Sequence, residues 1–383
     1  MSERKGMFAA LYRNEVEKLM AHRGRLLWIA FLVIVLGGSF LVYHGQASQR
    51  QMMAQNLTMA RQQVNHDRQA LKHATGINKS ALKSQLRADE KNLQQMQQQN
   101  GAQNEVQLVK ELKANLRQTP KQNRGSALEQ VATAQYLIDH GMTEYNPSKQ
   151  SGYRLVGDIF GGTALLIFAL LAVGIGADRI SQEVEAGTWG GLLLHAPVRT
   201  KIYLAKLCAS LTVVFGFVIA SAVVFFLLGS LLFGLGSPMV PHVVGIHLTA
   251  WPGTVPPQLA VPVQAFHIIP QWLYDLSALG LALVALSVLT AMMVALSMAF
   301  RSTIVAFIAG ALLVISGVLT RSAGSLAVID PATHIALIED WTGALAFQMG
   351  MKGLTLGIGL LVVGCWALAA IGFGVLWAKR LDV

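Results

Sequence analysis

Charged residues are scarce in this sequence of 383 residues. Asp, Glu, Lys and Arg make up only 13% of it, while 53% of the residues are hydrophobic. Soluble domains carry roughly 25% charged residues. This deficit excludes a disordered chain, a coiled-coil rod and an ordinary cytosolic enzyme as descriptions of the whole protein. The formal net charge of +10, on so apolar a chain, favours a membrane protein before a nucleic-acid-binding one.

Several chemical signatures are also missing. The two cysteines, Cys208 and Cys365, both lie in apolar runs and give neither a disulfide framework nor a metal-binding pattern. The sequence has no G-x-x-x-x-G-K-[ST] loop to cradle ATP phosphates, no H-E-x-x-H and no G-x-S-x-G. The spacing of His242, His247 and His267 matches no metal site. We therefore expect no catalytic, cofactor-binding or metal-binding residues in this chain.

Long apolar stretches are what the sequence does have. Crossing a bilayer takes roughly 17–25 residues of helix, and spanning segments of this kind are helical because lipid offers the backbone no hydrogen-bond partners. We predict an all-α polytopic membrane protein with six transmembrane helices and a helical extracytoplasmic insert. The predicted spans are Leu26–Tyr43, Ile159–Ala177, Ile202–Leu235, Leu276–Phe300, Ile304–Leu319 and Leu354–Trp377.

The short flanking segments predict the orientation of these spans. With the N-terminus inside, the inner flanks hold thirteen Lys and Arg residues, and the outer flanks apart from the insert hold three. Positive charge gathers on the cytosolic side of membrane proteins. We expect a bacterial-type cytoplasmic membrane, both termini in the cytosol and residues 44–155 outside. The first span, preceded by 25 residues, is expected to be an uncleaved signal anchor.

Residues 46–150 form a polar insert in this apolar chain. They contain 22 of the 50 charges and twenty glutamines. This contrast predicts four parts: an amphipathic cytosolic helix over 1–25, the first span at 26–43, an extracytoplasmic helical domain over 44–155, and a membrane domain over 156–383. Because the insert lies outside, its positive charge does not predict cytosolic nucleic acid as a partner.

Heptad spacing within the insert indicates paired helices. One apolar seam runs from Met53 to Ala74 with Asp67 in a core position, and a second runs from Leu82 to Met96 with Asp89 in a core position. Such short seams fold back on each other or pair with a second copy of the chain. A receptor or substrate-gating domain and a plain stalk or dimerisation element both remain open. A second outer segment, 236–272, holds seven of the eleven prolines and is expected to be an extended loop.

The inner loop 178–201 carries the most specific pattern in the sequence. Gly187 can end one helix, Thr188 can cap the next, and Trp189–His195 can form two helical turns before Pro197 stops them. The product is a short amphipathic helix on the inner membrane face. It is either a membrane-surface elbow or a docking site, and its three leucines and tryptophan favour docking of another protein.

The pattern of this loop resembles the signature of ABC type-2 permeases. The family signature consists of an acidic residue, Gly-Thr, a leucine pair, Pro-Val, and a base followed by lysine, and this loop contains each part. One difference is that Arg199-Thr200 stands where the family usually has a serine after Pro-Val. The resemblance covers about 25 residues in motif and the whole chain in topology. It implies a coupling helix that meets a separate ATP-binding subunit, in which ATP and magnesium would reside. The implied docking residues are Glu183, Glu185, Gly187, Thr188, Trp189, Leu192, Leu193, Pro197, Arg199 and Lys201.

Two further segments fit the same family. Residues 1–25 are expected to lie as an amphipathic helix on the inner surface, with Phe8, Leu11, Val16, Leu19 and Met20 on one apolar face. The segment Ser322–Gly350 is either a set of short helices dipping into the outer leaflet, as the resemblance implies, or an interfacial loop.

The function predicted from the sequence is therefore the membrane-spanning subunit of an ABC exporter. Its expected partners are an ATP-binding subunit, a second copy or a related permease, and the lipid membrane, but no nucleic acid. The alternative is a membrane-anchored sensor or adhesion protein whose outer hairpin is the working part. An intramembrane enzyme lacks any supporting group of residues. The cargo stays open.

Overall fold

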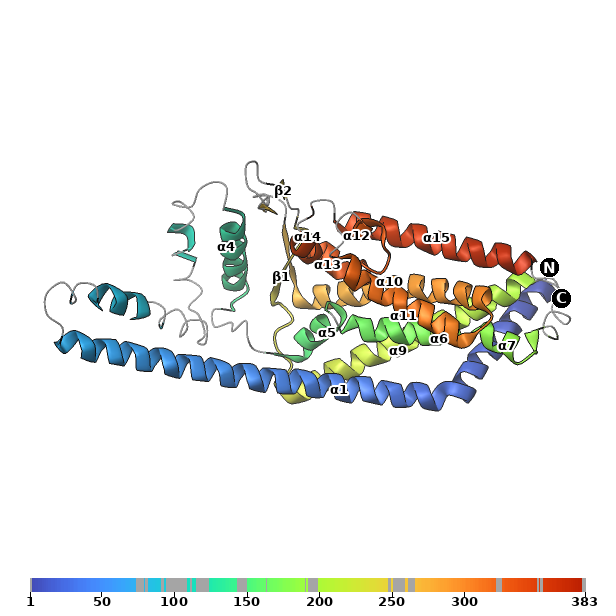
Figure 1. Cartoon of the computed structure of the whole chain (residues 1–383), viewed down its shortest axis with the longest axis horizontal. Coiled ribbons are helices and arrows are strands. Elements are labelled where there is room, and N and C mark those ends of the chain that lie inside the picture. Colours follow the sequence, from blue (N-terminus) through green and yellow to red (C-terminus); the bar gives the residue numbers. More distant parts are fainter. Residues whose placement is uncertain are drawn as a thin grey trace.

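The computed structural model describes most of the chain. The described residues are 2–73, 79, 82–90, 93, 109–110, 112–114, 124–142, 150–162, 164–189, 191, 199–246, 249–250, 259–260, 266–321, 326–349, 351 and 354–380. Helices dominate these residues. The helices are α1 (Ser2–His73), α4 (Arg124–Asp139), α5 (Gly152–Phe160), α6 (Leu165–Ala177), α7 (Ser181–Glu185), α9 (Arg199–Phe233), α10 (Gln271–Phe300), α11 (Thr303–Thr320), α12 (Leu326–Ile329), α13 (Leu337–Thr342), α14 (Ala344–Met349) and α15 (Leu356–Arg380). The long helices α6, α9, α10, α11 and α15 run roughly along one axis in an elongated bundle, whereas α4 stands across that axis outside it (Figure 1).

Five segments in the described part of the chain are long and apolar enough to cross a membrane. They are Leu165–Glu185, Arg199–Phe233, Gln271–Phe300, Thr303–Thr320 and Leu356–Arg380. Four of them match predicted spans to within a few residues, because charged residues or proline bound the apolar runs at most of their ends. The protein is therefore a multi-pass membrane protein of the all-α type.

The second span begins several residues later than predicted. We predicted one helix over Ile159–Ala177, but α5 ends at Phe160 and α6 begins at Leu165. Gly161 and Gly162 lie between them, and a Cβ at Gly161 would lie 2.6 Å from the carbonyl oxygen of Gly157. Helix α5, which holds only the first two residues of the predicted span, is a separate short helix. Ser151 caps it by accepting a hydrogen bond from the backbone N–H of Arg154 at 3.3 Å.

Helix α1 is the longest element and extends far beyond the bundle (Figure 1). Its 72 residues correspond to a contour length of about 108 Å at 1.5 Å per residue. It includes the predicted first span within one continuous helix and packs along α9, where the ring centroids of Phe31 and Phe217 lie 5.3 Å apart. The part beyond the bundle contacts the helical residues 82–90 through an ion pair of 2.7 Å between Arg68 and Glu90.

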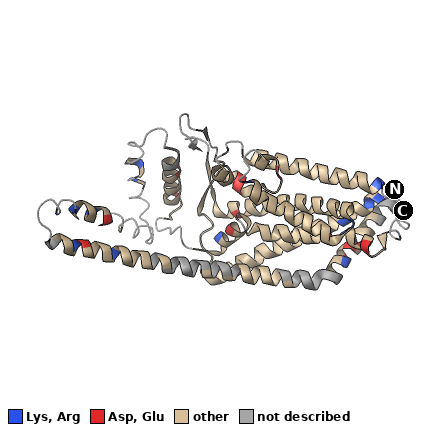
Figure 2. Cartoon of the chain, in the orientation of Figure 1, with Lys and Arg blue, Asp and Glu red and all other residues tan. Residues whose placement is uncertain are grey.

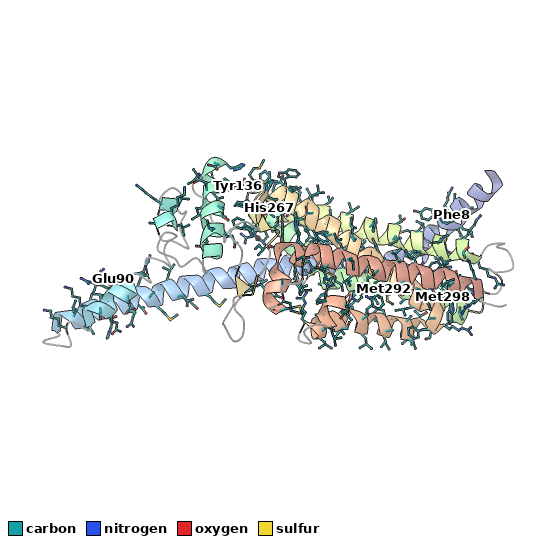
Figure 3. All side chains as sticks on the ribbon, turned by 90° about the horizontal axis from the view of Figure 1, so that it is seen from above. Phe8, Glu90, Tyr136, His267, Met292 and Met298 are labelled. Atoms are coloured by element: carbon teal, nitrogen blue, oxygen red, sulfur yellow. The ribbon has the colours of Figure 1, made fainter. Side chains whose placement is uncertain are left out.

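Two hydrophobic clusters hold the bundle together. The larger one joins α1, α5, α6, α9, α10 and α11, and the smaller one joins α9, α10 and α15. Side chains crowd these helix contacts, including those of Met292 and Met298 on α10 (Figure 3). Close contact requires glycine at one point, because a Cβ at Gly374 would collide with the ring of Tyr203 across the α9–α15 contact.

The proline-rich segment 236–272 forms short strands rather than an unpaired loop. Strand β1 (Pro241–Val244) pairs antiparallel with β4 (His267–Pro270), with Pro241 opposite Pro270, and β2 (Thr249–Ala250) pairs with β3 (Leu259–Ala260). The extended backbone was predicted, but the pairing was not. Helix α4 packs against β1 and β4, so the polar insert and this sheet meet at one end of the bundle.

Candidate functional site

The described part of the loop 178–201 lies at the end of the bundle where α1 begins and α15 ends (Figure 1). Its position is set by backbone contacts that continue from α6. The hydroxyl of Ser181 donates to the carbonyl of Ala177 at 2.6 Å, and Arg179 Nε donates to the carbonyl of Ile175 at 3.0 Å. Arg179 also forms a buried ion pair with Asp178. The chain therefore leaves α6 through a tight turn and enters α7 without an unstructured gap.

A buried lysine is the centre of this site. Lys206 lies on α9 and its side chain is only 1% exposed. Its Nζ donates to Glu15 Oε2 of α1 at 3.0 Å and to Glu183 Oε1 of α7 at 2.7 Å. A buried ammonium group is costly unless carboxylates surround it, so these contacts tie three elements from distant parts of the sequence to one atom.

A second lysine completes the cluster from the surface side. Lys18 Nζ lies 3.4 Å from Glu15 Oε1 and 3.4 Å from Glu183 Oε1. Partial burial lowers the pKa of Lys18, but the charges and hydrogen bonds of Glu15 and Glu183 raise it by more, so the net shift is upward. We call Glu15, Lys18, Glu183 and Lys206 the four-charge cluster. Two carboxylates and two ammonium groups balance its charge (Figure 2 shows charge gathered at this end).

Glu185 joins α7 to the start of α11. Its Oε1 accepts the backbone N–H of Thr303 at 3.0 Å, and its Oε2 accepts the Thr303 hydroxyl at 3.0 Å. A carboxylate at a helix N-terminus satisfies an open N–H group and interacts favourably with the helix dipole. Ser181 reaches the same hydroxyl at 3.1 Å. Movement of α7 therefore acts on α11 as well as on α6 and α9.

Gly187 forms the turn at the end of α7, as the sequence predicted. Gly187 has φ +68°, a left-handed conformation that favours glycine. The backbone N–H of Thr188 donates to the carbonyl of Glu183 at 3.0 Å, and its hydroxyl donates to the same oxygen at 3.3 Å. Thr188 thus bonds backward to the end of α7.

A cavity of about 510 Å³ opens beside the four-charge cluster. All four members of the cluster line it. The remaining lining residues are Ala21, Asp178, Arg179, Gln182, Ala186 and Thr188. Charged side chains of both signs therefore line this cavity, next to the apolar side chains of Ala21 and Ala186.

The predicted docking residues fall into three groups. Glu183 is partly buried in the four-charge cluster, whereas Glu185, Gly187 and Thr188 are exposed on the surface of the loop. Trp189, Arg199 and Lys201 are half-buried, the last two in the first turn of α9. Leu192, Leu193 and Pro197 lie outside the described residues, and so does most of the predicted helix Trp189–His195.

Glu15 and Thr303 were not among the predicted site residues. Glu15 is not one of the residues predicted on the apolar face of the N-terminal helix, yet it is only 4% exposed, whereas Met20, predicted on that face, is 48% exposed. The signal for Glu15 was its spacing of four from Leu11 and Leu19, which places a carboxylate on the buried stripe. Lys206 was not among the predicted docking residues either, and the signal for it is a charged residue within the apolar run of α9.

A second buried polar cluster lies at the opposite end of the bundle. His242 of β1 contacts Gln271 Oε1 at 2.6 Å, and Gln271 Nε2 donates to Asp275 Oδ1 at 2.7 Å. The ring of His242 also stacks on Tyr274, with centroids 4.1 Å apart. Among the residues that the structure describes, no three His, Cys, Asp or Glu side chains are grouped to hold a metal ion.

These features define the class of protein as a multi-pass membrane protein with a charge-linked loop at one end of its bundle. Residues 130–382 match the model of a family described as "Protein of unknown function (DUF2705)". Since the match covers more than half of the chain, the protein belongs to this family. The matched region begins within α4 and does not include α1. No curated protein and no solved structure gives a match.

Proposed function

We propose that this chain is the membrane-spanning permease subunit of an ABC type-2 exporter. ATP is hydrolysed by a separate subunit that docks around Glu183–Lys201. The observation that carries the proposal is the four-charge cluster: the loop with the family-like motif is held through Glu183 to both α9 and the N-terminal part of α1. A loop that only anchors the chain to the membrane surface has no need of such a link.

The contacts of α7 suggest how ATP-driven movement reaches the membrane. Glu183 binds Lys206 at 2.7 Å and Glu185 binds Thr303 at 3.0 Å. Buried charge pairs resist separation because each partner would be left unpaired at low dielectric. Movement of the loop is therefore passed to α9 through the Glu183–Lys206 pair. The hydrogen bonds of the exposed Glu185 to Thr303 link it to α11, and α6 is directly connected to α7.

The proposed topology has six spans, with the first in α1 at 26–43. The Lys and Arg bias places the cluster end in the cytosol and the sheet and α12–α14 outside. Residues 44–155 then form the extracytoplasmic domain, with residues 44–73 of α1 and residues 82–90 as its helical hairpin. We infer that two such chains, or this chain and a related one, line the path in a bacterial-type cytoplasmic membrane.

The spans favour an apolar or amphipathic cargo moved by external energy. Helices α6 and α11 contain no Asp, Glu, Lys or Arg. The charged residues of α9, α10 and α15 lie within about two turns of a helix end, at Arg199, Lys201, Lys206, Asp275, Lys379 and Arg380. Ion-coupled carriers usually keep ionisable residues deep in the bundle. The energy therefore comes from another chain, because this sequence has no P-loop.

The alternative is a membrane-anchored sensor or adhesion protein. The projection of α1 beyond the bundle favours it, since Glu90 lies far from the membrane body (Figure 3). The two hypotheses differ in one partner: an exporter subunit requires an ATP-binding subunit, and a sensor does not.

Purification of the tagged chain from its native membranes in mild detergent tests the proposal. We expect a subunit with a P-loop to copurify and the complex to hydrolyse ATP. Leu193→Asp in the loop is expected to abolish copurification, because a charge on the apolar docking face must be desolvated. Met52→Asp is the control, since Met52 is 53% exposed on the projecting part of α1. Copurification that persists unchanged in Leu193→Asp would contradict the docking site.

A further inference from the structure

A fully buried histidine–aspartate pair lies between α11 and α15, at the end of the bundle opposite the four-charge cluster. His334 and Asp340 have side chains that are both 0% exposed. His334 Nδ1 lies 2.9 Å from Asp340 Oδ2, and its Nε2 lies 3.1 Å from the carbonyl oxygen of Val328. Both ring nitrogens therefore face oxygen atoms.

A neutral His334 ring and an ionised Asp340 carboxylate together carry one proton fewer than this geometry requires. A neutral imidazole carries one N–H and one lone pair. The carbonyl of Val328 accepts hydrogen bonds only, so Nε2 carries an N–H. The lone pair of Nδ1 would then point at the Asp340 carboxylate, and two acceptors at 2.9 Å repel each other. One more proton, on Nδ1 or on Asp340, is needed to satisfy the contact.

The pair connects several elements at this end. Val328 belongs to α12, Asp340 belongs to α13, and a Cβ at Gly359 of α15 would lie 2.6 Å from Asp340 Oδ2. The carboxylate is thus packed directly against the backbone of α15. Losing the shared proton would place an unpaired charge in this contact, where the cost of burial is high.

The neighbouring charged groups Asp330, Arg321 and Glu339 have partners of their own. Asp330 accepts hydrogen bonds from Ser316, Thr320 and the backbone of Ala332, so it is already satisfied. Arg321, at the end of α11, binds Glu339 at 2.9 Å. Helix α10 and strand β1 also contact α13. Tyr274 of α10 is the titratable group of these elements that interacts with Glu339, and Asp158, Asp275 and His242 lie beside Tyr274.

We propose that His334 and Asp340 form a proton-binding lock that holds the segment 326–342 against α15 and releases it as the surrounding solution becomes alkaline. The lock is independent of the proposed transport function, because it rests on the buried pair alone. It is a pH-sensitive device of the fold, and it acts on the segment that closes this end of the bundle.

The direction of titration agrees with this proposal. Burial lowers the pKa of His334, but the hydrogen bond and charge of Asp340 raise it by more, so the net shift is upward from 6.5. A raised folded-state pKa gives stability that is complete below the unfolded value and is lost as the pH rises through the folded value. The lock is therefore closed in acid and opens above the ordinary range of histidine.

Hydrogen exchange of the full chain in lipid nanodiscs tests the lock. The reporters are amides donated within the segment, such as His334 N–H to Pro331 and Glu339 N–H to Ala336. After correction for the intrinsic exchange rate, we expect their protection to fall between pH 6 and pH 9, because the closed state binds the proton more tightly than the open state.

Asp340→Asn is the decisive variant. Its amide N–H can donate to Nδ1 of a neutral ring, so the contacts survive without the extra proton and protection is expected to be independent of pH. His334→Gln, which also removes the titration, serves if Asp340→Asn fails to fold. His267→Gln changes an exposed histidine and is expected to keep the wild-type slope. A flat wild-type profile, or an unchanged slope in Asp340→Asn, would overturn the proposal.

Discussion

Replacing Lys206 with methionine removes the charge that joins three elements at one end of the bundle. Methionine retains the length and apolar volume of the lysine stem but leaves Glu15 and Glu183 without their closest cation. Those contacts are 3.0 Å and 2.7 Å long, and the Glu15 side chain is only 5% exposed. The variant therefore leaves two carboxylates near each other in a partly buried site.

The expected loss of stability follows from this burial. Removing one partner of a buried ion pair costs about 3–5 kcal/mol. Lys18 remains 3.4 Å from both carboxylates, so we expect the lower end of that range, about 3 kcal/mol. At 1.4 kcal/mol per factor of ten, this is roughly a hundredfold change in the unfolding equilibrium. Equilibrium unfolding in mixed detergent micelles measures it.

A double-mutant cycle separates the ion pair from general damage. Glu183→Gln in the Lys206→Met background removes one uncompensated carboxylate and is expected to recover part of the loss, so the two effects are not additive. Arg13→Met is the surface control, because the Arg13–Glu17 pair has side chains 81% and 61% exposed and is screened by water. A Lys206→Met variant as stable as wild type, or strictly additive effects, would refute the cluster as a structural link.

Two further predictions concern other contacts. Gly374→Leu is expected to destabilise the α9–α15 contact by about 1–3 kcal/mol through overpacking against Tyr203. Gly372→Leu is the control and is expected to leave stability unchanged, because no atom lies within 4 Å of its added Cβ. Equal thermal unfolding temperatures of the two variants would contradict this prediction. In the hairpin, the hydrogen bond to Asp67 raises the pKa of Asp89 above 3.8, so hydrogen exchange over 60–90 is expected to slow as the pH falls through the raised pKa. Asp67→Asn should remove that dependence, and a slope that persists in it would exclude the carboxyl pair as the cause.

The spans could be predicted because burial in lipid leaves a local mark on the sequence. Helices α9, α10, α11 and α15 coincide with apolar runs that mostly end at charges or at Pro270. The break between α5 and α6 depends on how closely the backbone at Gly161 approaches its neighbours, which hydropathy does not record. The β1–β4 pairing joins residues 23 to 29 positions apart, and extended conformation alone does not predict a partner strand.

Only those parts of the candidate site that depend on residues close together in the sequence could be predicted. Gly187 ends its helix as its residue type suggests, since the left-handed conformation favours glycine. The contact of Lys206 with Glu15 spans 191 positions, and no motif links the two residues. In the sequence, Glu15 and Lys206 are charged residues at positions where the pattern of their helix favours apolar ones. Such a charge indicates a buried partner but does not identify it.

Site-specific photo-crosslinking tests the central claim most directly. A photoreactive residue is introduced at Leu193 in native membranes, with Leu231, 82% exposed near the opposite end of α9, as the matched position. The exporter hypothesis predicts that position 193 captures a subunit carrying a P-loop and that position 231 does not. Capture of no ATP-binding protein at 193, or equal capture at both positions, would contradict the assignment of this loop as the ATPase docking site.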